Sequence, residues 1–171
     1  GPGELRGLAA VESRGIDRGE VFAVVMPRST RLLSDTVTFL WHPFKGAKRY
    51  AVVIMDRDDK VVARRETADT SLTLVLGPLG VKEGALYAWH VEQTDDAAKH
   101  SSDQSLWLLG GADRDAAVRL VGDVRSEIGD EAEAIGALIL AQVYEDTGLV
   151  YDAWRSYRAA MEAAPDITNY K

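Results

Sequence analysis

The hydrophobic pattern of this chain changes its period at Gly110-Gly111, and this change constrains the fold more than any other feature. Over residues 21–110, apolar and polar residues alternate, which is the period of half-buried strands. Beyond Gly111, apolar residues recur every three or four positions, which is the period of amphipathic helices. The 171 residues are therefore expected to hold a linker over 1–20, a β unit over 21–110 and a helical unit over 111–171.

The β unit is expected to contain seven short strands. Each apolar or alternating run spans about five to eight residues, and Pro, Gly or Asp clusters separate the runs. The expected strands begin near Val21, Val37, Tyr50, Val61, Leu72, Ala85 and Ser105. Seven strands at this spacing favour a β-sandwich, so the expected fold class is mainly β with added α.

Three features of the β unit resemble the fibronectin type III domain. Trp41 ends the second strand, where that family keeps a core Trp, and Tyr50 begins the third strand. A third match is the family's corner motif, with Leu79, Gly84, Tyr87 and Val91 at its fixed positions. The resemblance implies an Ig-like sandwich in which the Tyr87 hydroxyl bonds back to the backbone near Leu79. Such motifs concern packing and carry no activity.

Three helices are expected after Gly111, with Gly129, Gly148 and Pro165 as their stop signals. Asp113 and Asp130 are expected to cap the first two helices. A 34-residue window from Ala134 then places small and aromatic residues in a fixed order: Ala137, Leu140, Ala141, Tyr144, Gly148, Ala153, Tyr157, Ala160 and Pro165. This order resembles one tetratricopeptide-type repeat, a helical hairpin.

The resemblance implies a protein-binding surface on the inner face of the hairpin's first helix. That face is expected to carry Ile135, Leu138, Gln142 and Glu145. None of the four is the Lys, Arg or Asn with which some repeats hold a partner's C-terminal carboxylate. An apolar centre with an acidic rim suits an apolar or basic partner segment. The alternative is that Ile135 and Leu138 pack only on the preceding helix.

One repeat cannot bury both of its faces, so a cover for the hairpin is expected. The helix at 113–128 is a poor copy of the repeat, because Arg119 and Asp123 stand where Ala153 and Tyr157 stand one period later. The cover is this helix, the sandwich, further repeats after Lys171, a partner, or a second copy in a homodimer.

The net charge of −7 is concentrated in the helical unit. Residues 1–110 hold 14 Lys and Arg against 15 Asp and Glu, whereas residues 111–171 hold 6 against 12. This acidity argues against a nucleic-acid partner.

Cysteine is absent, which excludes disulfides, thiolate catalysis and Cys-based zinc sites. No apolar run is long enough to span a membrane. Gly1-Pro2 resembles the remnant left by a tag protease, so membrane attachment is expected only through segments outside this sequence.

Several polar groups are candidates for a chemical site. His42 and His90 would need neighbouring strands and a carboxylate to share a metal ion. His100, Ser101 and Asp103 are too close in sequence for a nucleophile–base–acid arrangement. The acidic run from Asp56 to Asp59 lacks the Gly and Glu of a calcium loop, which favours a hairpin turn. The chain is therefore expected to be no enzyme, with no metal and no cofactor.

The aromatic side chains are expected mainly in the core. Trp107 is the best candidate for an aromatic ring between the two units. Trp154 is expected either to be exposed or to pack between the hairpin and the sandwich. A glycan site would instead need exposed, coplanar rings.

These observations predict a non-catalytic protein–protein interaction or scaffold module. The order of sandwich and hairpin resembles extracytoplasmic regions of bacterial envelope and regulatory proteins, which implies a periplasmic or other extracytoplasmic location, with the cytoplasm as the alternative. The alternative function is a glycan- or small-ligand-binding module of the envelope.

Overall fold

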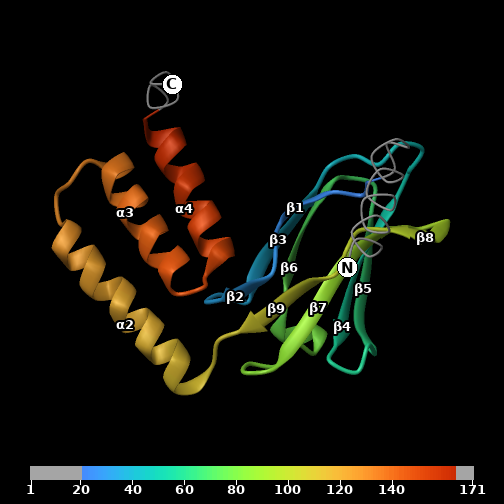
Figure 1. Cartoon of the computed structure of the whole chain (residues 1–171), viewed down its shortest axis with the longest axis horizontal. Helices are drawn as coiled ribbons and strands as arrows, with labels where there is room; N and C mark the ends of the chain where they lie inside the picture. Colours follow the sequence, from blue (N-terminus) through green and yellow to red (C-terminus); the bar gives the residue numbers. More distant parts are fainter. Residues whose placement is uncertain (1–20, 165–171) are drawn as a thin grey trace, which may run out of the picture.

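The computed structural model describes residues 21–164, and these form a β-sandwich followed by three helices (Figure 1). Within this part of the chain there are nine strands: β1 (Val24–Met26), β2 (Thr30–Leu32), β3 (Thr36–Trp41), β4 (Tyr50–Asp56), β5 (Val61–Thr67), β6 (Ser71–Val75), β7 (Leu86–Gln93), β8 (Asp96–His100) and β9 (Gln104–Leu108). A short 3-10 helix, η1 (Gly77–Leu79), follows β6.

The strands form two sheets. The smaller sheet has the order β1-β3-β6, and the larger has the order β2-β9-β7-β4-β5 with β8 paired to β7. All pairs are antiparallel except β2 and β9, which run parallel. The core between the sheets includes Phe39, Trp41 and Trp89, each at most 2% exposed.

The expected sandwich is confirmed, but the expected number of seven strands is wrong for the described residues. The two additional strands are β2 and β8. Strand β2 has only three residues, Thr30–Leu32, which are too few to show a period. Strand β8 is polar, and four of its five residues are exposed, so it carries no apolar alternation.

The corner motif forms the tyrosine corner that the sequence implied. The Tyr87 hydroxyl accepts a hydrogen bond from the Lys82 backbone N–H at 3.0 Å and donates one to the Gly80 carbonyl at 3.4 Å. Tyr87 itself is buried in the core. The acidic run after β4 is a turn, as expected, because one Asp56 carboxylate oxygen accepts the backbone N–H groups of Asp58 and Lys60.

Three helices follow the sandwich: α2 (Gly111–Ile128), α3 (Glu133–Asp146) and α4 (Val150–Ala163). Neither expected aspartate caps its helix. The N-cap of α2 is Gly110, which places Asp113 inside the first turn, and the N-cap of α3 is Ala132. No helix within residues 21–164 is long and apolar enough to cross a membrane.

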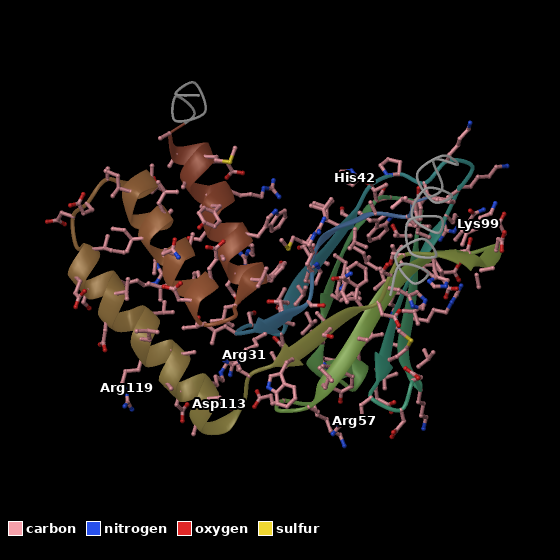
Figure 2. All side chains as sticks on the ribbon, in the orientation of Figure 1. Arg31, His42, Arg57, Lys99, Asp113 and Arg119 are labelled. Atoms are coloured by element: carbon pink, nitrogen blue, oxygen red, sulfur yellow. The ribbon has the colours of Figure 1, made fainter. Side chains whose placement is uncertain are left out.

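The hairpin of α3 and α4 is docked on the sandwich beside β2 (Figure 1). Tyr151, in the first turn of α4, is 3% exposed and belongs to the sandwich core. The Arg31 backbone N–H of β2 donates to the Gly148 carbonyl at 3.1 Å, and the Arg31 guanidinium donates to the Thr147 carbonyl at 3.2 Å. Figure 2 shows the Arg31 side chain between β2 and the helices.

Candidate partner-binding site

Helix α3 is apolar on two opposite sides, and only one of them is covered. Its inner side packs against α4 and α2 through Leu140, Ala141 and Tyr144, which are all at most 8% exposed. Helices α2 and α3 approach closely at Gly136, where a Cβ atom would lie 3.0 Å from the Ile128 Cγ2. A helix that is apolar all round is normally buried all round, so the uncovered side requires an explanation.

The uncovered side carries three large apolar residues. Ile135 is 48% exposed, Leu138 is 38% exposed and Ile139 is 41% exposed. Their spacing of three and four residues places them in one stripe on the helix surface. Gln142 continues the stripe one turn later and is also exposed.

The stripe ends in carboxylates at the last turn of α3. The Gln142 side-chain amide donates to Asp146 Oδ1 at 3.1 Å. Desolvation raises the pKa of the Tyr157 phenol on α4, and its hydrogen bond to Glu145 and the charges of Glu145 and Asp146 raise that pKa further. Tyr157 therefore borders this acidic end of the stripe.

We refer to six exposed residues of α3 as its outer face: Ile135, Leu138, Ile139, Gln142, Glu145 and Asp146. The structure places all four residues expected from the sequence on it, so the face that the repeat pattern names inner is the solvent-exposed side of α3 in this molecule. It also adds two residues that the sequence reasoning missed, Ile139 and Asp146. The signal was present, because each lies four residues after a residue of the expected set.

A groove of about 520 Å³ lies on the other side of α3, between the three helices. Its lining includes Ile128, Leu140, Tyr144, Asp152 and Arg155. Desolvation raises the pKa of the half-buried Asp152 carboxyl, an effect opposed by the hydrogen bond from the Leu33 N–H and by the charge of Arg155. Because both acidic and basic side chains line this groove, including Glu131 and Arg125, its lining does not favour a ligand of one charge.

The two candidate interdomain aromatics both lie between the sandwich and the helices. Trp107 packs against the cluster formed by Leu109 and the helical residues. Trp154 packs against the sandwich core, and its ring centroid lies 6.2 Å from that of Tyr151. The Arg158 guanidinium carbon lies 4.9 Å from the Trp154 ring centroid. Trp41 and Trp89 are buried in the sandwich core, whereas Trp107 and Trp154 are half-buried.

The histidines and Ser101 make local contacts. His90 Nδ1 lies 3.0 Å from Asp103 Oδ1, and His100 Nδ1 lies 2.7 Å from the Ser101 carbonyl. The buried Ser101 hydroxyl accepts a hydrogen bond from the Val91 N–H and donates one to the Ser102 carbonyl. Both of its hydrogen bonds are therefore made to the backbone. His42 is exposed just past the end of β3 (Figure 2).

Over residues 21–164, no group of three or more His, Cys, Asp or Glu side chains is arranged to hold a metal ion.

No protein-family model matches the sequence, and neither does any curated protein. Solved structures similar to the chain include an Fn3-like protein from Clostridium thermocellum, at 19% identity over 53% of this chain and 97% of that chain, with a TM-score of 0.36. They also include the fn3 domain of human collagen alpha-1(XX) chain, at 18% identity over 52% and 84%, with a TM-score of 0.34.

A third similar structure is a beta-1,2-glucanase from Parabacteroides distasonis, at 14% identity and a TM-score of 0.35. It matches 83% of this chain, but the chain spans only 24% of that enzyme. The description of the fold therefore rests on the strand order and the tyrosine corner.

Proposed function

We propose that this chain is a non-catalytic protein–protein interaction module that binds its partner through the outer face of α3. One observation carries the proposal: Ile135, Leu138 and Ile139 are between 38% and 48% exposed on a helix whose opposite side is buried. Keeping three large apolar side chains of one stripe in water costs free energy that a bound partner would recover.

The order of small and aromatic residues supports the same proposal. The residues of the tetratricopeptide-type pattern include Leu140, Ala141, Tyr144, Ala153 and Ala160, and all five are buried in the described hairpin. We propose that the hairpin is one such repeat and that α2 covers part of its inner side. We further propose that the chain belongs to an extracytoplasmic bacterial envelope or regulatory protein.

The test compares partner capture by variants that differ only on the surface. Bait proteins would be the wild type, Leu138→Glu on α3, and Val118→Glu on α2, where Val118 is 51% exposed. After crosslinking in envelope and cytosol fractions of the source cells, quantitative mass spectrometry would compare the captured proteins. We expect one partner to be kept by wild type and Val118→Glu and lost by Leu138→Glu.

Matched changes at Ile135, Gln142 and Glu145 would extend this test. If capture of every partner is unchanged by all four substitutions on α3, the proposal is wrong. A partner lost equally with Val118→Glu would instead indicate a general effect of added charge.

A further inference from the structure

The outer face of α3 is apolar towards the start of the helix and acidic at its end. Its apolar residues Ile135, Leu138 and Ile139 lie in the first half, and Glu145 and Asp146 lie in the last turn. Glu145 lies seven positions after Leu138, which is about 10 Å along the helix axis at about 1.5 Å per residue. An occupant must therefore offer apolar surface at one end and a different chemistry at the other.

The carboxylates at the acidic end, those of Glu145 and Asp146, have no ion-pair partner among the described residues. Helix α3 contains three carboxylates and no Lys or Arg. The C-terminal end of the helix adds partial negative charge of its own, of which the Arg31 guanidinium offsets a part through its hydrogen bond to the Thr147 carbonyl. The two arginines of α4 lie over aromatic rings, Arg155 over Tyr151 and Arg158 over Trp154.

A second copy of the chain fits this face poorly in either orientation. Two parallel α3 helices would bring Glu145 and Asp146 against their own counterparts. Two antiparallel helices centred on the apolar residues would place Glu145 near Asp130 and Glu131, which lie just before the other α3. Shifting the antiparallel register would set carboxylates against Ile135, which costs desolvation without a hydrogen bond. Like charges placed opposite one another also disfavour association.

We propose that the outer face of α3 takes an amphipathic helix of a different protein that carries an apolar cluster and, two turns away on the same side, two or more Lys or Arg side chains. This inference rests on the proposed function and names the chemistry of the partner. Helix packing supplies the apolar contact, and the cations meet the carboxylates and the helix C-terminus. Charge complementarity of this kind selects the partner and its register.

A displayed library of 18-residue helical peptides tests the proposal. One side of the helix is randomised, and selection uses the whole chain, with Val118→Glu carried through in parallel as a control for surface charge. Selected peptides are expected to combine apolar residues spaced by three or four positions with Lys or Arg about seven positions away. Selection against a Glu145→Lys, Asp146→Lys double variant is expected to exchange these cations for Asp or Glu.

Binding of a selected peptide is then measured by fluorescence anisotropy. The double charge reversal is expected to weaken a cationic peptide about tenfold or more, consistent with a few charge pairs at a partly desolvated site. Raising the NaCl concentration from about 0.05 M to about 0.5 M is expected to weaken the same peptide, because the Debye length falls below the reach of exposed charges.

The outcomes distinguish a failure of the charge inference from a failure of the proposed docking face. Peptides that lose binding on Leu138→Glu but show no Lys or Arg enrichment would overturn the charge inference and leave the docking face in place. Selections that yield no peptide sensitive to Leu138→Glu would overturn both. A concentration-dependent dimer that Leu138→Glu dissolves, seen by light scattering, would assign the face to a second copy and overturn the inference.

Discussion

The Tyr151 hydroxyl of α4 accepts a hydrogen bond at 2.9 Å from the Thr38 backbone N–H of β3. The Tyr151 backbone N–H donates in turn to Thr30 Oγ1 of β2 at 3.1 Å. Since β2 and β3 belong to different sheets, one helical residue joins both layers of the sandwich. The helical unit therefore completes the β core and holds the outer face of α3 in a fixed position relative to the sandwich.

Substitutions of Tyr151 test this contact between α4 and the two sheets. Tyr151→Phe keeps the ring but leaves the Thr38 N–H without its partner, at an expected cost of about 1 kcal/mol in the free energy of unfolding. Tyr151→Ala also removes the buried ring and is expected to cost about 3–5 kcal/mol. Urea denaturation followed by Trp fluorescence measures both.

Tyr144→Phe is the control for Tyr151→Phe, because the Tyr144 hydroxyl has no protein hydrogen-bond partner among residues 21–164. It is expected to leave stability nearly unchanged. Unaltered stability in Tyr151→Ala would show that the ring does not fill the core.

Removal of the helices is expected to destabilise the sandwich. A chain ending at Gly110 loses Tyr151 and the packing of Val150 and Trp154 on the core, and it uncovers Leu109, which is 1% exposed in the whole chain. Exposure of this apolar surface lowers the free energy of unfolding. Differential scanning calorimetry is expected to show a lower Tm for the shortened chain and one cooperative transition for the whole chain. Two separate transitions in the whole chain would contradict the shared core.

The loop before α4 depends on glycine at one position. Gly148 has φ +77, and an added Cβ would lie 3.2 Å from Arg31 Cδ. Gly148→Ala is expected to cost about 1–2 kcal/mol for the left-handed backbone, plus a further loss from displacing Arg31. Gly46→Ala is the matched control, because Gly46 has φ +87 and nothing within 4 Å of its Cβ position. Equal losses for the two variants, measured by thermal unfolding, would exclude a contribution from the Arg31 contact.

The sequence predicted the parts of this fold that local patterns determine. Alternating residues marked most strands, and the spacing of Tyr87 from Gly84 predicted the tyrosine corner. Strand β2 was not predicted, because its three residues pair with β9 across 76 positions of sequence and a local pattern carries no information on such a pairing. Asp130 lies too far from the first turn of α3, which begins at Glu133, to cap it.

Most residues of the outer face of α3 could also be predicted from a local pattern. Helical spacing placed Ile135, Leu138, Gln142 and Glu145 on one face, because that depends only on the pitch of a single helix. The role of Tyr151 was not predictable, since it depends on how α4 meets β2 and β3. Which side of α3 stays open is likewise a property of the tertiary packing of α2 and α4.

Asp152 is expected to give the chain a measurable pH dependence. Its pKa is raised above 3.8 in the folded state, mainly by desolvation, so the folded state binds more protons than the unfolded state over the interval between the two pKa values. The contribution of Asp152 to stability therefore falls as the pH rises through this interval. Asp152→Asn removes this ionisation, and its amide oxygen can still accept the Leu33 N–H.

Denaturation at several pH values would measure the difference in unfolding free energy between Asp152→Asn and wild type. We expect this difference to shift in favour of the variant as the pH rises from about 3 to about 7, because only the wild type ionises a desolvated carboxyl. A difference that is constant with pH would show that Asp152 has the same pKa in both states.

Leu138→Glu is expected to leave the fold intact, which separates its effect on binding from any effect on folding. Leu138 is 38% exposed, and a substitution at an exposed position without special contacts usually changes stability by at most about 0.5 kcal/mol. Leu140→Ala, two residues along the same helix, removes a side chain that is 8% exposed and packs with Leu149 and Ala153. That change is expected to cost about 2–5 kcal/mol. Chemical denaturation of both variants distinguishes the two sides of α3, and a comparable loss for Leu138→Glu would show that its face is already covered within the molecule.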